Sequence, residues 1–135
     1  MTSLKSRWSW LPRKSAARQE LGARSEALAR RFLALHGYAI HEVNVRFPVG
    51  EIDVVAWDGP ALCFVEVRSA SSLEWGGALE SIGDRKRRHL IRAARWYLQR
   101  LHPLPEEIRF DVVAVDWSGP DAPRIDLIRG AFEAD

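Results

Sequence analysis

Two carboxylates, Asp53 and Glu66, stand within stretches of the sequence that are otherwise mostly apolar. The stretches 51–57 and 61–68 are rich in β-branched and aromatic residues, which favour strands. Only the short segment 58–60, with a glycine and a proline, separates them, so we expect an antiparallel hairpin. Acidic residues inside strands need a partner or a function, because an unpaired buried charge is unfavourable.

The hairpin predicts which side chains face each other. Facing residues of an antiparallel pair have a constant number sum, and a turn at Gly59-Pro60 makes that sum 119. Asp53 then faces Glu66 and Glu51 faces Arg68, so Asp53, Glu66 and Arg68 emerge on one face of the sheet. Two carboxylates that close repel each other, and the pKa of one is expected to rise. A divalent cation removes the conflict, and Mg²⁺ prefers such oxygen ligands.

An ion pair is the alternative to a metal site at this hairpin. A cation such as Arg68 or Arg46 could neutralise the two acids without any metal. The register also matters, because a slip of one residue would place Asp53 and Glu66 on opposite faces. From the hairpin alone both interpretations stay open.

The rest of the chain predicts the elements that must position this hairpin. Hydrophobic periodicity indicates a first helix with Leu21, Leu28, Phe32 and Leu35 on its apolar face. The predicted elements are a helix over 16–36, a strand over 38–46, a turn over 47–50, the hairpin, a loop over 69–82, a helix over 84–101, a strand over 109–116 and a short edge strand over 123–129. This α-β-β-β-α-β-β order predicts one α/β domain over 16–135, preceded by a basic tail over 1–15.

Composition narrows the class of protein. The chain has 135 residues, of which 47% are hydrophobic, enough for one domain with a core. The single cysteine, Cys63, excludes an internal disulfide framework and a cysteine-based zinc site. No apolar run has the length of a membrane span or of a signal peptide. We therefore expect a cytoplasmic protein without a membrane partner.

The second predicted helix is strongly basic. Residues 85–100 hold seven lysines and arginines and no acid. Five of these cations can reach one exposed side of the helix: Arg85, Lys86, Arg88, Arg92 and Arg95. Such a surface would bind nucleic-acid phosphates in a salt-dependent way. The alternative is a solvated charged face. Cations at the positive end of a helix dipole are unfavourable, which argues against a purely structural purpose.

Two segments of the sequence resemble a known family. Residues 50–56, Gly-Glu-Ile-Asp-Val-Val-Ala, and residues 64–68, Phe-Val-Glu-Val-Arg, resemble the signature of the YraN / UPF0102 family of small bacterial proteins. That family is similar to the PD-(D/E)XK, or restriction-endonuclease-like, superfamily and to archaeal Holliday junction resolvases. Further matching positions are Glu26, Gly37-Tyr38, Asn44-Val45-Arg46, Lys86 and Arg109 to Val113.

The resemblance implies a fold and a set of roles. The fold would be a restriction-endonuclease-like αβββαβ core with a mixed central sheet flanked by helices. Asp53 and Glu66 would be metal ligands, Glu26 would complete the site, and Mg²⁺ or Mn²⁺ would be the cofactor. The chemistry would be hydrolysis of DNA phosphodiesters, branched DNA included. A homodimer is expected by analogy with the resolvases. The expected nucleic-acid-binding residues are Arg46, Arg85, Lys86, Arg88 and Arg92.

Arg68 departs from the family signature, which has lysine at this position. Arginine keeps the charge and can contact a phosphate with two hydrogen bonds, but it cannot act as a base near neutral pH. Three hypotheses follow. The protein is a metal-dependent endonuclease with Arg68 at the scissile phosphate, or a catalytically weak or inactive nucleic-acid-binding protein of the same fold, or a structural protein whose carboxylates form ion pairs.

Overall fold

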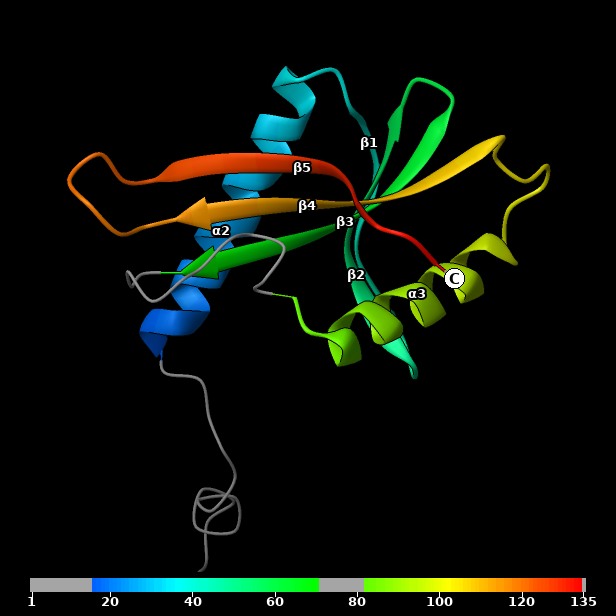
Figure 1. Cartoon of the computed structure of the whole chain (residues 1–135), viewed down its shortest axis with the longest axis horizontal. Helices are drawn as coiled ribbons and strands as arrows, with labels where there is room; N and C mark the ends of the chain where they lie inside the picture. The colour runs from blue at the N-terminus through cyan, green and yellow to red at the C-terminus, as the bar shows by residue number, and fades with distance from the viewer. Residues whose placement is uncertain (1–15, 71–81, 135) are drawn as a thin grey trace, which may run out of the picture.

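The computed structural model describes residues 16–70 and 82–134 (Figure 1). Its helices and strands are α2 (Ala16–Leu35), β1 (Ala39–Phe47), β2 (Gly50–Asp58), β3 (Ala61–Ala70), α3 (Asp84–Leu98), β4 (Glu107–Asp116) and β5 (Arg124–Phe132). This order confirms the predicted mixed α/β class and contains the αβββαβ core. The predicted tail over 1–15 and most of the predicted loop over 69–82 lie outside the described residues.

The five strands form one mixed sheet in the order β1-β2-β3-β4-β5. β3 and β4 run parallel, whereas the other neighbouring pairs are antiparallel. Parallel neighbours need a long crossover connection, and α3 lies in the one between β3 and β4. β5 lies at the edge of the sheet as predicted, directly after Pro123.

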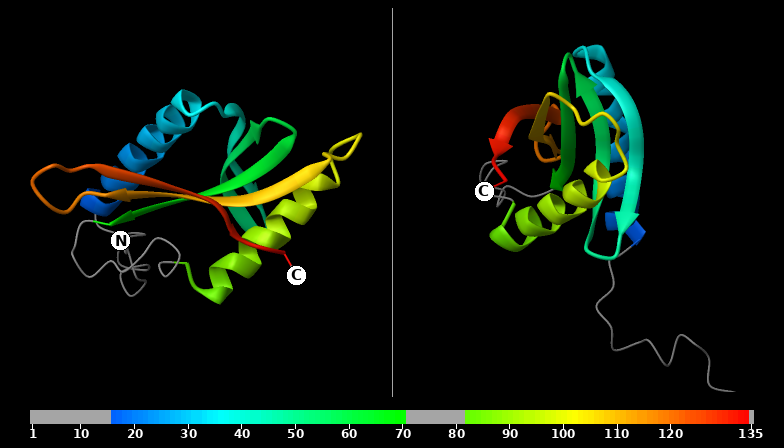
Figure 2. Two further views of the ribbon diagram at one scale, coloured as in Figure 1. Left: turned by 45° about the horizontal axis from the view of Figure 1, so that its top comes forward. Right: turned by 90° about the vertical axis from the view of Figure 1, so that its right-hand side faces the viewer.

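The two helices lie against different sides of the sheet (Figure 2). α2 packs on one hydrophobic cluster through Ala29 and Leu33, and α3 packs on a second cluster through Leu90 and Tyr97. No helix in the described ranges is long and apolar enough to cross a membrane.

The apolar face predicted for α2 is confirmed in part, because Leu21, Leu28 and Phe32 are partly buried and Leu28 packs on the cluster under this helix. Its buried residues are Ser25, Ala29 and Leu33, while Leu35 is 81% exposed. Small residues at two of these positions let the helix approach the sheet closely, and the indole Nε1 of Trp117 donates to the Ser25 hydroxyl at 2.8 Å. The most deeply buried face of α2 is therefore formed by Ser25, Ala29 and Leu33, and Leu28 packs beside it.

The face predicted for α3 is confirmed, since Leu90, Ala94 and Tyr97 are buried and Ile91 and Leu98 are partly buried. α3 ends earlier than predicted, at Leu98 instead of residue 101. The remaining residues to 101 continue as a tight turn whose backbone N–H groups donate back to α3.

The side chains of β1 and β2 change sides partway along the strands. Val43 and Val54, which are paired, contact the cluster under α2. Two residues further along, the paired Val45 and Ile52 belong to the cluster under α3. Regular alternation would keep both pairs on one side. Asn44, between the two valines, has a φ of +51°, which turns the strand at this point.

Candidate active site

The hairpin of β2 and β3 has the predicted register over its turn-proximal part. Paired residues run from Asp58 and Ala61 to Val54 and Val65 with the number sum of 119. The pairing ends there, so neither of the predicted pairs beyond it, Asp53 with Glu66 and Glu51 with Arg68, belongs to the ladder. Each strand stays with its other neighbour instead: Glu51 is paired with Arg46 of β1, and Arg68 with Ala114 of β4.

Asp53 lies one residue beyond the last paired residues of β2 and β3, Val54 and Val65. The backbone N–H of Val67 in β3 donates to the Asp53 carboxylate at 2.8 Å. A side-chain oxygen thus serves as acceptor where the backbone ladder has ended. This hydrogen bond holds the carboxylate of β2 against β3, although the two strands are no longer paired.

Glu66 is 3% exposed and forms its ion pair with Lys86. The ammonium Nζ of Lys86, in the first turn of α3, lies 2.9 Å from Oε1 of Glu66. The ion-pair partners considered from the sequence were Arg68 and Arg46, and the ion pair with Glu66 is formed by Lys86 instead. Arg46 instead contacts the exposed Glu51 at 3.5 Å.

A glycine allows α3 to come this close to the hairpin. At Gly50, the first residue of β2, an added Cβ would lie 2.7 Å from the carbonyl oxygen of His89. Only a residue without a side chain lets β2 and the backbone of α3 approach to this distance. The glycine that opens the motif 50–56 therefore helps to bring Lys86 to Glu66.

The carboxylate pair, Asp53 and Glu66, has the raised pKa that two adjacent acids predict. Burial raises the pKa of Asp53 to about 7, and the charge of Glu66 adds to the increase. The N–H of Val67 and the charge of Lys86 act in the opposite direction. A positive ligand would relieve the remaining conflict.

Arg68 lies two residues after Glu66 in β3 and carries a hydrogen-bond donor without an acceptor. Its Nε is buried, and no residue of the described part of the chain accepts a hydrogen bond from it. A buried donor without an acceptor is unfavourable, so such atoms often mark the place of a ligand. A guanidinium group is suited to a phosphate oxygen.

Glu26 is partly buried on α2, at a distance along the chain from the hairpin. Within residues 16–70 and 82–134, no three His, Cys, Asp or Glu side chains form a group that could hold a metal ion. The structure therefore does not bring Glu26 into a three-ligand group with the carboxylate pair. Two carboxylates still fit Mg²⁺, which keeps several waters and commonly takes only one or two protein carboxylates.

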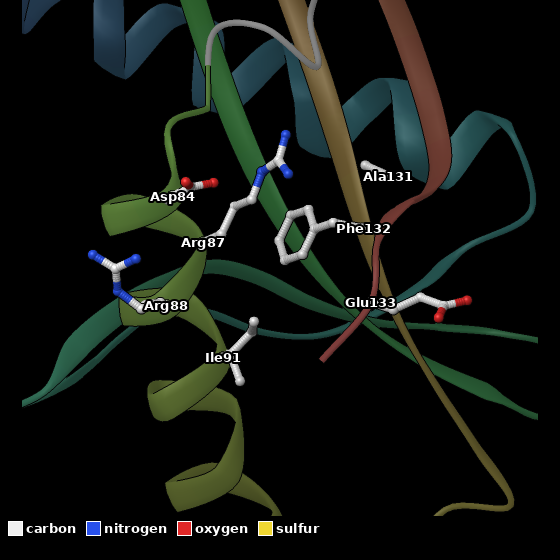
Figure 3. A pocket seen from close by; sticks show the side chains of 7 residues that line it. All are labelled: Asp84, Arg87, Arg88, Ile91, Ala131, Phe132 and Glu133. Atoms are coloured by element: carbon white, nitrogen blue, oxygen red, sulfur yellow. The ribbon is translucent and has the colours of Figure 1, made fainter. Parts of the chain in front are cut away.

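The predicted cations of α3 are at the surface. Arg85, Lys86, Arg88 and Arg92 are all exposed. Arg87 differs, because its guanidinium lies 5.6 Å from the ring of Phe132 in β5. Figure 3 shows Arg87 directed toward Phe132 across a cavity of about 430 Å³, whereas Arg88 points away from that ring.

A buried ionic cluster elsewhere in the sheet was not predicted. Asp111 of β4 is fully buried and accepts hydrogen bonds from Arg109, from the Tyr38 hydroxyl and from the N–H of Gly130. Arg109 also reaches Asp58 at 2.7 Å. The sequence did contain a signal for this cluster, because Arg109 and Asp111 carry opposite charges two residues apart in a strand that is otherwise rich in valine. All oxygens of Asp111 have protein partners, which indicates a structural role.

Comparison with known proteins identifies relatives of this chain. The model of "Uncharacterised protein family UPF0102" matches residues 25–115. A UPF0102 protein of Dehalococcoides mccartyi is 44% identical over 117 residues, which cover 85% of this chain and 94% of the relative. Another, from Ectopseudomonas mendocina, is 41% identical over 124 residues, 88% of this chain and 99% of the relative. A third, from Chlorobaculum parvum, is 46% identical over 99 residues, 73% and 77% of the two chains.

Proposed function

The chain belongs to the uncharacterised protein family UPF0102, and on that premise we propose that it is a metal-dependent endonuclease of the restriction-endonuclease-like kind that acts on DNA phosphodiesters. The observation that carries this proposal is the buried pair of Asp53 and Glu66 at the point where two strands separate. Buried acids that repel each other reduce stability, so their presence at a strand junction favours a binding or catalytic role.

Each residue has a role in the proposed reaction. Asp53 and Glu66 would hold the metal, and Glu26 of α2 is the third ligand that the family resemblance implies, although the described residues do not group it with the pair. A bound Mg²⁺ or Mn²⁺ would supply a more acidic water and positive charge at the phosphate. Arg68 holds the scissile phosphate through its unsatisfied Nε. Because a guanidinium keeps its proton near neutral pH, Arg68 stabilises charge and does not act as a base.

The exposed cations around the pair position the rest of the DNA. The predicted phosphate contacts are Arg46, Arg85, Lys86, Arg88 and Arg92. α3 links these contacts to the proposed active site, because its first turn reaches Glu66 and its next turns continue the row of cations. Sequence-independent binding follows, since phosphate contacts carry no base information.

Nucleic-acid binding without cleavage is the second candidate. The presence of arginine at position 68 and the absence of a three-ligand acidic group in the described residues favour it. In this case the carboxylate pair would bind a metal or Lys86 without supporting turnover.

A cleavage assay separates the two candidates. Linear duplex and four-way junction DNA are incubated with the full chain and Mg²⁺ or Mn²⁺. An endonuclease cuts in wild-type form and loses activity in Asp53→Asn and Glu66→Gln. The matched control is Glu51→Gln, an exposed acid of the same strand, which should cut like the wild type. An inert wild type together with a cutting Arg68→Lys variant would identify a degenerate nuclease.

Branched DNA as substrate requires two cuts and hence two sites. We include a homodimer in the proposal for this reason. Sedimentation of the full chain with and without junction DNA tests it, and a monomer on the junction would restrict the proposal to single cuts.

A further inference from the structure

The ion pair between Lys86 and Glu66 joins an exposed side chain to a buried one. The Lys86 ammonium is 2.9 Å from Glu66, whose side chain is only 4% exposed, but half of the Lys86 side chain is exposed. The Lys86 side chain therefore extends from the surface of α3 to the buried carboxylate of Glu66. Its flexible four-carbon stem allows the ammonium to leave without any backbone movement.

α3 does not depend on this ion pair for its position. Its apolar face packs on the sheet through Leu90, Ala94 and Tyr97, and its backbone at His89 contacts Gly50. The ion pair is thus an addition to a helix that is already placed by packing. Loss of the pair should leave the helix and the carboxylates where they are.

A divalent cation and the Lys86 ammonium need the same oxygens. Both are attracted to Glu66, and two positive charges at one carboxylate repel each other strongly where water is excluded. Binding of the cation is therefore opposed by the lysine. The released ammonium would lie beside exposed Arg85 on the same turn of α3, in the row of cations proposed to meet phosphates.

We propose that Lys86 is a displaceable counter-ion of the metal site: it neutralises Glu66 until a divalent cation replaces it, and it then serves as a phosphate contact. This inference rests on the proposed function and specifies how the site is regulated. It makes binding of the metal and binding of DNA mutually favourable, because each removes Lys86 from Glu66.

Calorimetric titration of Mn²⁺ into the full chain at pH 8 and low salt tests the displacement. Lys86→Met keeps the length of the side chain and removes its charge, and it should bind Mn²⁺ about five-fold more tightly than the wild type. Arg124→Met, which removes an exposed cation of β5 outside the proposed binding surface, should change this affinity by less than about two-fold. Thermal unfolding checks that the variants fold, and Lys86→Gln serves as a second neutral variant.

Duplex DNA binding supplies a readout that a merely structural lysine would not change. Ca²⁺ should increase the DNA affinity of the wild type more than that of Lys86→Met. Unchanged or weaker Mn²⁺ binding in Lys86→Met would overturn the counter-ion role. If Mn²⁺ binds the wild type but not Glu66→Gln, the proposed metal site holds even when the counter-ion role of Lys86 is overturned. Absence of Mn²⁺ binding in all variants would overturn both.

Discussion

The Asp53 carboxylate is held where its charge is disfavoured. Burial and the neighbouring Glu66 raise its pKa to about 7, above the ordinary value of an aspartate. An acid whose pKa is raised on folding destabilises the folded state increasingly as pH rises from its unfolded pKa to its folded pKa. Asp53→Asn keeps an acceptor for the N–H of Val67 and removes the charge. It should increase the free energy of unfolding at pH 8 by about 1–2 kcal/mol.

Urea unfolding measures this gain, which should vanish near pH 4, where Asp53 is protonated in the folded wild type. Glu51→Gln is the control, because this acid is exposed and should leave stability unchanged at both pH values. A loss of stability in Asp53→Asn at pH 8 would contradict a strained carboxylate pair.

Asp111 shows the opposite behaviour. Burial alone would raise its pKa, but hydrogen bonds from Arg109, Gly130 and Tyr38 together hold the pKa below its ordinary value. The ionised form therefore stabilises the fold at neutral pH, and this contribution is lost as pH falls below about 4. Asp111→Asn should cost about 3 kcal/mol at pH 7, because it leaves Arg109 incompletely paired.

The measurement is urea unfolding between pH 7 and pH 3. The variant should show a smaller acid-induced loss of stability than the wild type, and Asp126→Asn, an exposed acid of β5, should behave like the wild type. Equal slopes for Asp111→Asn and wild type would mean that Asp111 is not the titrating group.

At the scale of elements, the approach of α3 to β2 depends on Gly50. A Cβ there would meet the carbonyl oxygen of His89 at 2.7 Å, which is backbone and cannot turn away. Gly50→Ala should push α3 outward and lower the free energy of unfolding by about 2 kcal/mol. Gly22→Ala in α2, where an added Cβ meets nothing within 4 Å, is the matched control and should be neutral or stabilising. Thermal unfolding measures the stability of both variants. Equal stabilities of Gly50→Ala and Gly22→Ala would refute the tight contact.

The turn of β1 at Asn44 is a second property of an element. Its φ of +51° is accessible to glycine and tolerated by asparagine, but unfavourable for a β-branched residue. Asn44→Gly should change stability little, whereas Asn44→Val should cost about 1–2 kcal/mol. His41→Val, at another exposed position of β1, should cost less. Equal stability of the valine variants in urea unfolding would show that the turn does not require asparagine.

At the scale of the whole molecule, one helix carries most of the expected contacts with nucleic acid. Arg85→Gln or Arg92→Gln should weaken duplex binding and reduce the slope of log K against log salt by about 0.9 for each lost phosphate contact. Arg124→Gln removes an exposed cation of β5 and should leave the slope unchanged. Fluorescence anisotropy between about 50 and 200 mM salt measures these slopes. Equal slopes in all four proteins would exclude α3 as the contact surface.

The sequence alone determined the order of elements, the hairpin and the identity of the two acids. These features depend on local causes, namely periodicity, turn residues and neighbouring motifs, which act over a few residues. The edge position of β5 was predictable for the same reason. A raised pKa for one of the two acids was also predicted from their proximity, although burial, the larger cause at Asp53, depends on tertiary packing.

Tertiary structure alone decided which groups surround the carboxylate pair. The sequence named Arg68 and Arg46 as ion-pair partners, but α3 brings Lys86 from twenty residues beyond Glu66. The ladder was also expected to continue past Asp53, whereas β2 and β3 separate there because each remains bonded to another strand. Contacts between distant segments depend on how helices pack and where strands diverge, and no local pattern encodes either. For this reason the sequence could predict the acids of the site but not the cation that neutralises them.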